Sequence, residues 1–404
     1  MPTSTSRRWL VMAGSLLAAA AAEGQVRYDF TEVTRIAAGA VIGQNVGTPV
    51  PGFDLLLMKD GQVVYHETFG TMSPGQVVAC DSATKTISGA VIMSLTERSA
   101  TPFSLSTRVS FYMPAYGGDK STITIRQCFA HTSGLAESNV EGNALITLQQ
   151  AAFLTSQLPL QFSPAAAFAY GGSSMQTAGA VAELASGMSW NALFAERLAT
   201  PLGFVQTRFA LTTATNPRVP GGCVSNATEF SRFMEMLRAG GVHEGRRVLG
   251  AASVASMFTR QTPAGIPIIN SPLPGVSDYG VGVWLDQRDA SGQLVGALAA
   301  GARGFSSWID FDDGMVGCFA TEFTTAENAY PLCVQFREAA QRAVRQGPVC
   351  VADFNRDGGV DGSDVAAFFF AWERGGDGAD VNEDGGTDGA DIEAFFGVWE
   401  AGGC

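Results

Sequence analysis

Strand-like and helical segments follow one another in an order that restricts how the first 345 residues can fold. Apolar residues around the turn Asp60-Gly61 predict a hairpin of two strands, 53–58 and 62–69. Apolar runs near the other end predict strands at 280–286, 292–300, 306–310 and 315–321. Helical patterns lie between them, at 82–98, 173–185, 190–198 and 227–239. We therefore expect an α/β domain, an antiparallel sheet flanked by helices with a helical region inserted into it.

The composition changes near residue 346, where the chain becomes acidic and rich in glycine. Of the formal net charge of −13, the stretch 351–404 contributes −11, from 13 Asp and Glu against two Arg. The change predicts a large domain, residues 23–345, followed by a small module, residues 346–404. Because no basic cluster could neutralise phosphates, nucleic acid is not an expected partner.

The first 22 residues have the pattern of an export signal. Two arginines precede an apolar run, 9–22, that ends in small residues. A run of about 14 residues is shorter than the roughly 20 that a membrane-spanning helix needs. We therefore expect cleavage before Glu23, no membrane span, and a protein that is secreted, periplasmic or at the cell surface.

A serine and a lysine lie three residues apart where the helical pattern at 82–98 begins. Lysine is scarce: only Lys59, Lys85 and Lys120 occur, against 22 arginines, which cannot act as bases. Ser82 and Lys85 would share one face of the helix, so that the amine could take the serine proton and activate the hydroxyl as a nucleophile. In the alternative interpretation, Ser82 merely caps the helix and Lys85 faces solvent.

Four stretches of sequence carry a resemblance to a known family. They are Ser82-Ala83-Thr84-Lys85; the loop 123–135 with His131-Thr132-Ser133-Gly134; Phe162-Ser163-Pro164 and Phe168-Ala169-Tyr170-Gly171-Gly172, then Pro201-Leu202-Gly203-Phe204; and the helix 227–234. In order and spacing, residues 52–342 resemble the class C β-lactamases and D-alanyl carboxypeptidases, relatives of penicillin-binding proteins that also include esterases. The resemblance implies the same fold and a serine hydrolase that forms an acyl-enzyme.

The resemblance also implies roles for further residues. Tyr170 takes the position of the tyrosine that carries the proton between nucleophile and leaving group. The backbone N–H groups of Ser82 and Ala302 would form the oxyanion hole. His131 belongs to a loop that supports the site in these proteins, so we expect a structural role for it rather than that of a general base.

Two positions depart from the family pattern. Gly172 stands where an asparagine often contacts the lysine and the substrate amide. Ala299-Ala300-Gly301 stands where a cation, then Thr or Gly, then Gly is usual. The candidate substrate-binding residues are Gly172, Gly301 and Arg303. Arg303 is the nearest cation, and it either binds a substrate carboxylate or is a solvated surface charge.

The acyl substrate is left open by these motifs, since an ester, a lactam, a D-amino peptide or a lipid all fit serine chemistry without a cofactor. One alternative is a catalytically inert relative that binds a ligand in the same cleft. Another is a component that acts in assembly or surface attachment through its acidic module. We favour an enzyme, because an inert site has no reason to keep Ser82, Lys85 and Tyr170 together.

The acidic module contains two copies of one loop pattern, 27 residues apart. Oxygen donors stand at the positions that calcium loops use: Asp353, Asn355, Asp357, Gly359, Asp361 and Asp364, then Asp380, Asn382, Asp384, Gly386, Asp388 and Asp391. An apolar helix pattern follows each copy, which predicts a small, all-α, EF-hand-like module with structural calcium. Asp at the twelfth position resembles dockerin modules, so a cohesin-like or cell-surface protein is the expected partner. Cys350 and Cys404 bracket the module and are the predicted disulfide pair.

Overall fold

The computed structural model describes residues 27–44, 46–99, 101–273, 278–382 and 386–401. It divides into two units, Tyr28–Gly347 and a unit that begins at Pro348 and also includes Arg27. The division falls where the composition changes, next to the boundary expected at residue 346. The predicted export signal, 1–22, lies outside the described residues. No helix in the described ranges is long and apolar enough to cross a membrane.

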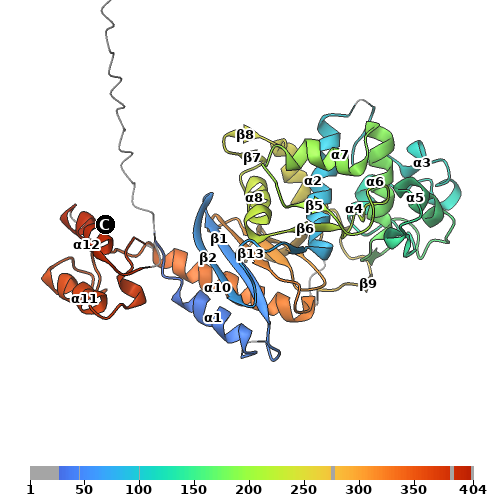
Figure 1. Cartoon of the computed structure of the whole chain (residues 1–404). Helices are drawn as coiled ribbons and strands as arrows, with labels where there is room; N and C mark the ends of the chain where they lie inside the picture. The colour runs from blue at the N-terminus through green and yellow to red at the C-terminus, as the bar shows by residue number, and fades with distance from the viewer. Residues whose placement is uncertain (1–26, 45, 100, 274–277, 383–385, 402–404) are drawn as a thin grey trace, which may run out of the picture. The chain divides into compact units, whose positions relative to one another are not determined.

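A six-stranded antiparallel sheet lies at the centre of the larger unit, in the order β10-β11-β12-β13-β1-β2 (Figure 1). Its strands are β1 (Gly52–Lys59), β2 (Gln62–Gly70), β10 (Trp284–Arg288), β11 (Leu294–Ala300), β12 (Ser306–Asp310) and β13 (Met315–Ala320). The register pairs Asp54 with Ala320 and Lys59 with Met315, so strands from the two ends of the domain meet inside the sheet. The predicted antiparallel sheet with an inserted helical region is confirmed.

Helices pack on the faces of this sheet (Figure 1). On one face lie α1 (Thr31–Val41) and α10 (Ala326–Gln346), and Phe336 of α10 packs its ring against Phe53 of β1. On the other face lies α8 (Ala227–Arg238), which was predicted at 227–239 and contacts β1, β12 and β13. The sequence patterns did not indicate α1 or α10.

The helical region between β2 and β10 holds the remaining elements of this unit. The helices are α2 (Thr84–Glu97), α3 (Val109–Tyr112), α4 (Ile125–Phe129), α5 (Leu148–Ser156), α6 (Ser173–Ser186), α7 (Trp190–Phe194) and α9 (Ala251–Met257). Short strands are β3 (Val78–Ala79), β4 (Phe168–Ala169), β5 (Arg208–Phe209), β6 (Cys223–Ser225), β7 (Val242–His243), β8 (Arg246–Arg247) and β9 (Ile268–Asn270). Every residue of α2 from Thr84 to Leu95 is buried, so this helix runs through the interior and places Lys85 away from solvent.

Two predicted elements differ from the structure in detail. The helix expected at 190–198 is α-helical only to Phe194 and continues as a π-helical turn, Ala195–Ala199. The strand expected at 280–286 begins only at Trp284. Gly282 has φ +76°, and a Cβ there would lie 2.2 Å from the carbonyl oxygen of Lys85. The stretch before Trp284 thus passes close to α2, where only a glycine avoids a clash.

The smaller unit pairs two helices, α11 (Gly362–Trp372) and α12 (Gly389–Glu400), each preceded by one copy of the acidic loop. Each helix begins with a capping box, formed by an aspartate at the N-cap and a second aspartate three residues later. Phe368 and Phe395 hold the same position in the two copies, and their rings stack with centroids 4.3 Å apart. The duplication therefore gives each helix an apolar partner, which a single copy would lack.

The cysteines of the described residues fall into two groups. Cys350, at the start of the smaller unit, is disulfide-bonded, while its predicted partner Cys404 lies outside the described residues. The cysteines of the larger unit are free and buried: Cys80, Cys128, Cys223, Cys318 and Cys333.

A buried ion pair attaches α10 to the sheet. Arg337 Nη1 lies 3.0 Å from Asp286 Oδ2, and the two side chains are 4% and 1% exposed. Burial raises the pKa of the Asp286 carboxyl, and the neighbouring Arg337 opposes that rise. Each charge is thus held in the interior mainly by the other.

We predict that Arg337→Met lowers the free energy of unfolding by about 3–5 kcal/mol, because Asp286 would remain buried without its partner. Urea unfolding measures this loss. Arg345→Met is the matched control, since Arg345 pairs with Asp313 while its side chain is 58% exposed, and it should cost less than about 1 kcal/mol. Equal losses in the two variants would contradict the assignment.

Candidate active site

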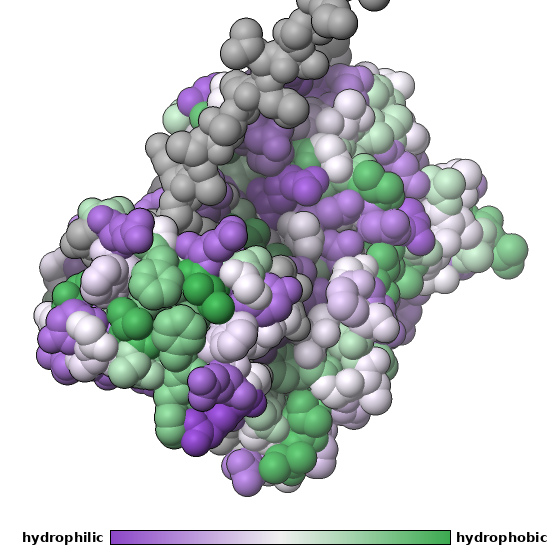
Figure 2. Space-filling model, turned by 60° about the vertical axis from the view of Figure 1, so that its left-hand side comes forward, coloured by the Kyte–Doolittle hydropathy of each residue, from purple (hydrophilic) through white to green (hydrophobic). Residues whose placement is uncertain are grey.

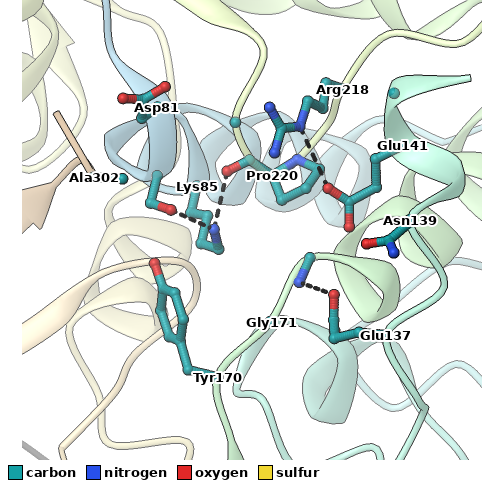
Figure 3. A pocket seen from close by; sticks show the side chains of 14 residues that line it. Asp81, Lys85, Glu137, Asn139, Glu141, Tyr170, Gly171, Arg218, Pro220 and Ala302 are labelled. Carbon is teal, nitrogen blue, oxygen red and sulfur yellow. Dashed lines mark hydrogen bonds and ion pairs between the residues drawn. The ribbon is translucent and has the colours of Figure 1, made fainter. Parts of the chain in front are cut away.

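A cleft of about 480 Å³ opens where the start of α2, the segment before α6 and the connection after β11 meet (Figure 3). Its lining residues are Asp81, Ser82, Lys85, Glu137, Asn139, Glu141, Gly142, Tyr170, Gly171, Gly172, Arg218, Pro220, Gly221 and Ala302. The structure thus brings together Ser82, Lys85, Tyr170, Gly172 and Ala302, which the sequence had singled out. It adds two carboxylates and an arginine, Glu137, Glu141 and Arg218, which no sequence motif indicated.

Ser82 and Lys85 lie at the start of the buried helix α2. Lys85 Nζ is 2.9 Å from Ser82 Oγ and 3.1 Å from the carbonyl oxygen of Pro220. Lys85 is 4% exposed, and Ser82 makes no capping hydrogen bond, so the interpretation of a plain helix start is wrong. In its neutral form the Lys85 amine can accept the hydroxyl proton of Ser82 over this distance, which is the geometry that a general base requires.

Tyr170 lies beside this pair, with its hydroxyl pointing into the cleft toward Lys85 (Figure 3). Its ring centroid is 4.7 Å from Lys85 Nζ, a distance at which the π-face attracts a cation. Trp284 of β10 stacks on the ring of Tyr170, with the two ring centroids 5.4 Å apart and an interplanar angle of 17°. The sheet therefore fixes the position of Tyr170 next to the proposed base.

His131 packs against Tyr170 and does not itself line the cleft. Its ring centroid is 4.4 Å from that of Tyr170, and its Nδ1 accepts a hydrogen bond from the Gly171 N–H at 3.3 Å. Burial, with a smaller contribution from the charge of Lys85, holds the pKa of His131 well below its ordinary value. A neutral imidazole in contact with the aromatic ring and the backbone fits the structural role that was expected for it.

Two backbone donors stand at the nucleophile. The N–H groups of Ser82 and Ala302 donate no hydrogen bond to any described residue, which leaves both available for an oxyanion. Gly301 does not line the cleft, and its N–H donates to the carbonyl of Phe305 at 2.7 Å. A Cβ at Gly301 would lie 2.3 Å from the carbonyl oxygen of Cys80, so glycine allows β11 to approach the nucleophile turn.

Arg303 does not face the cleft as a free cation. Its guanidinium binds Asp81 through Nε at 2.9 Å and Nη2 at 3.1 Å, and Glu322 lies 3.6 Å away. Its backbone N–H also donates to Asp81. Because Asp81 directly precedes Ser82, this pair clamps the connection after β11 onto the nucleophile turn. The two readings of Arg303, as a substrate ligand or as a solvated charge, both missed this contact.

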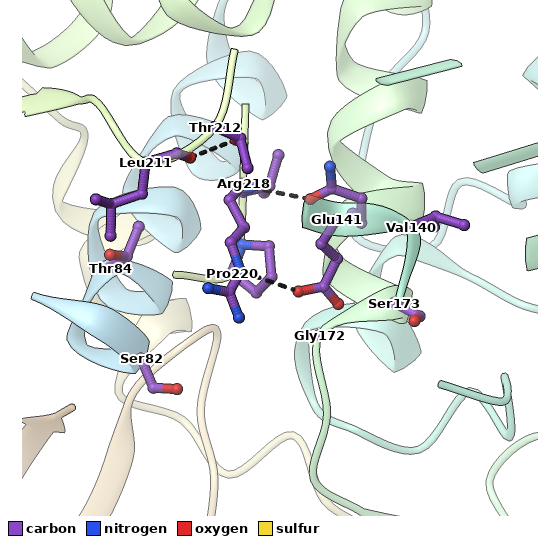
Figure 4. Close-up of polar contacts among 12 residues, drawn as sticks. Ser82, Thr84, Val140, Glu141, Gly172, Ser173, Leu211, Thr212, Arg218 and Pro220 are labelled. Atoms are coloured by element: carbon purple, nitrogen blue, oxygen red, sulfur yellow. Dashed lines mark hydrogen bonds and ion pairs between the residues drawn. The ribbon is translucent and has the colours of Figure 1, made fainter. Parts of the chain in front are cut away.

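Gly172, which replaces the family asparagine, faces the carboxylate of Glu141 (Figure 4). A Cβ at position 172 would lie 2.1 Å from Glu141 Oε1, so no larger side chain fits while Glu141 keeps its place. Glu141 is 8% exposed, and its Oε2 lies 3.5 Å from Arg218 Nε. Burial, and then the charge of Glu137, raise the pKa of Glu141, while Lys85 and Arg218 oppose the rise. The missing amide is therefore replaced in space by a carboxylate from another segment.

Glu137 lies on the same wall, but it has a different set of contacts. Its carboxylate accepts the backbone N–H groups of Gly172, at 3.0 Å, and Ser173, at 3.3 Å. These are the first donors of α6, so Glu137 satisfies the start of that helix. A Cβ at Gly171 would lie 2.0 Å from Glu137 Oε1, so both glycines make room for carboxylates.

Comparisons with known proteins place most of the larger unit in one family. The family described as Beta-lactamase matches residues 40–329, most of the larger unit. The chain belongs to the β-lactamase family. This family and its serine motif make the protein a serine hydrolase. A search of curated proteins found no match.

Solved structures show the same fold as this β-lactamase-family protein. A β-lactamase candidate from Bacteroides dorei is 26% identical, with a TM-score of 0.69 over 79% of this chain and 100% of that one. A hydrolase with promiscuous acyltransferase activity is 20% identical, with a TM-score of 0.65 over 76% of this chain and 97% of that one. A family VIII carboxylesterase is 19% identical, with a TM-score of 0.63 over 78% of this chain and 97% of that one.

We predict that Gly172→Asn lowers the free energy of unfolding by about 1–3 kcal/mol, because the new side chain must displace the buried Glu141 carboxylate. Adding Glu141→Ala in the same chain should recover at least half of the loss, as measured by urea unfolding. Gly142→Asn is the control: a Cβ there meets nothing within 4 Å, so its effect should stay below about 0.5 kcal/mol. Additive effects of the two substitutions would show that Gly172 and Glu141 do not share space.

Proposed function

We propose that this β-lactamase-family hydrolase cleaves carboxylic esters through an acyl-enzyme on Ser82. The observation that carries the proposal is the 2.9 Å contact between Lys85 Nζ and Ser82 Oγ in a buried site. In the first step Ser82 Oγ attacks the acyl carbon and its proton passes to neutral Lys85, while the oxyanion receives the N–H groups of Ser82 and Ala302. The proton then moves through Lys85 and Tyr170 to the leaving alkoxide, which departs as the alcohol.

Water completes the cycle. It attacks the Ser82 ester, gives one proton to the Lys85–Tyr170 pair, and the acid departs as Ser82 regains its hydroxyl proton. The two halves therefore use the same groups in opposite directions. No cofactor enters either half.

The charges of the cleft favour esters over substrates that carry a carboxylate. The family position for a cation is Ala299, and the nearby Arg303 is already bound by Asp81. Arg218 is paired with Glu141. A β-lactam or a D-alanyl peptide would therefore lose a charge-assisted hydrogen bond, typically about 1.5–3 kcal/mol, or roughly ten- to a hundredfold in rate. The solved carboxylesterase of similar fold is consistent with this preference.

We predict that a fluorophosphonate labels the wild type on Ser82, as read by mass spectrometry of the labelled peptide, and that Ser82→Ala is not labelled. Lys85→Met should lower ester turnover at least about a thousandfold, since the nucleophile and its base act as one unit. Lys120→Met is the control and should keep full activity, because Lys120 does not line the cleft. Absence of a Ser82 adduct would favour the inert, ligand-binding alternative.

We also predict that phenyl esters are hydrolysed with a kcat/KM at least about tenfold higher than a cephalosporin. The missing free cation is the physical reason. Steady-state kinetics on both substrates measures the ratio, with Ser82→Ala giving the background. Faster hydrolysis of the cephalosporin would refute the substrate ranking.

For the smaller unit, we propose that both acidic loops bind calcium. The carboxylates at the twelfth position are buried and fold back onto their own loops: Asp364 accepts the N–H groups of Asn355 and Asp361 at 3.0 and 2.8 Å. Asp391 does the same in the second copy, with Asn382 and Asp388 at 3.1 and 2.7 Å. These closed loops, rich in oxygen, suit a hard cation. Asp384 of the second set lies outside the described residues.

The backbone turn of the first loop also supports calcium. Gly358 at the sixth position has φ +88°, as the sharp turn of such a loop requires. No group of three His, Cys, Asp or Glu converges as a metal site within the described ranges. The expected ligand set is broader, since it also draws on the amide of Asn355 and the carbonyl of Gly359.

We predict that chelation of calcium from the full-length chain removes amide protection from α11 and α12 and leaves α2 protected, because unneutralised carboxylates repel one another. Hydrogen exchange followed by mass spectrometry measures both regions at once. Asp353→Ala should weaken the calcium response, whereas Glu373→Gln, outside the loops, should not. Unchanged exchange of the smaller unit on chelation would rule out structural calcium.

Export and a partner for the smaller unit belong to the same proposal. Residues 1–22 support passage to the periplasm, the cell surface or the medium, where calcium is available and Cys350 can oxidise. Apolar side chains reach the surface on the face shown in Figure 2, and in the smaller unit Phe370 is 61% exposed. We propose a cohesin-like or cell-surface protein as its partner, which a pull-down with calcium and with chelator tests.

A further inference from the structure

We propose that Glu141 selects acyl substrates that carry a primary ammonium group, which its free carboxylate oxygen binds across the cleft from the nucleophile. This inference rests on the proposed ester hydrolysis and names the substrate class within it. It concerns the wall of the cleft formed by Glu137, Glu141 and Arg218, which faces Ser82 across the cleft (Figures 3 and 4).

Glu141 has one oxygen in use and one available. Oε2 lies 3.5 Å from Arg218 Nε, and Oε1 has no hydrogen-bond partner among the described residues. The side chain is 11% exposed, and the residue lines the cleft. A carboxylate this buried gains free energy from any donor that can reach its open oxygen.

The neighbouring carboxylate does not compete for this role. Both oxygens of Glu137 accept backbone N–H groups, from Gly172 and Ser173, so its hydrogen-bonding capacity serves the start of α6. It still adds a negative charge to the wall. Glu141 is therefore the acceptor that a ligand meets, and Glu137 strengthens its attraction for a cation.

The chemistry of the replaced side chain decides what can bind here. An asparagine at position 172 would offer both a donor and an acceptor, whereas an ionised carboxylate only accepts. The space for that asparagine is filled by Glu141, because a Cβ at Gly172 would lie 2.1 Å from Oε1. The substrate must therefore bring the donor, and an ammonium group gives the strongest bond because it is charge-assisted.

The net charge of this wall is negative, which also favours an ammonium group. Glu137 and Glu141 carry two negative charges against one positive charge on Arg218, which Glu141 already pairs. On the opposite side Arg303 is compensated by Asp81. Lys85 is neutral when it acts as the base. In the reactive state this wall therefore attracts cations and repels a carboxylate.

The test compares esters that differ only in the amine. The substrates are the phenyl esters of β-alanine and glycine and their N-acetyl derivatives, assayed on the full-length wild type and on Glu141→Gln. We expect the wild type to prefer the free amines by at least about tenfold in kcat/KM, and Glu141→Gln to reduce that preference at least about tenfold. Glu244→Gln, which removes a carboxylate whose side chain is 83% exposed, should keep both activity and preference.

A wild type that prefers the N-acetyl esters, or a preference unchanged in Glu141→Gln, overturns the inference while leaving ester hydrolysis intact. Failure of the proposed function looks different, since no ester would then be turned over and no adduct would form on Ser82.

Ligand-observed NMR provides a measurement that needs neither turnover nor a variant. Propylammonium should bind the wild type at least about tenfold more tightly than propanoate. Tighter binding of propanoate would assign recognition to Arg218 and refute the role of Glu141.

Discussion

The placement of Lys85 in the protein interior is the constraint on which the rest of the cleft depends. An amine removed from water loses hydration, and it is kept there by the few groups that can replace that hydration. Lys85 finds the hydroxyl of Ser82, the carbonyl of Pro220 and the π-face of Tyr170. Each comes from a different segment of the chain. The fold must therefore hold three segments around one nitrogen atom.

The scaffold meets that demand through contacts that have no catalytic chemistry of their own. Trp284 of the sheet stacks on Tyr170, and His131 packs beside the same ring. Arg303 binds Asp81 and so joins the connection after β11 to the turn that carries the nucleophile. The sheet, the buried helix α2 and the helical region thus meet at one point, and the cleft forms there.

Much of this arrangement could be predicted from the sequence, because its signals are local or periodic. The strands, the helix after Ser82 and the spacing of Ser82 and Lys85 each depend on residues near one another in the chain. Gly172 was visible as a departure from the family pattern. What replaces the lost amide was not, because Glu141 reaches it from a short 3-10 helix, Val140–Gly142, 31 residues earlier, and no periodic pattern links those segments. The pairing of Arg303 with Asp81 joins still more distant parts of the chain, and therefore only the structure revealed it.

The pairing of β1 with β13 has a consequence for how the protein is made. Asp54 lies opposite Ala320, so the first long strand cannot find its neighbour on that side until almost the whole domain has left the ribosome. Contacts so distant in sequence slow folding, and folding intermediates meanwhile expose apolar surface and unpaired strand edges. The nascent chain carries the apolar segment of β1 through most of its synthesis without its β13 neighbour. A chaperone that holds such segments fits this order of events better than completion of the sheet during translation.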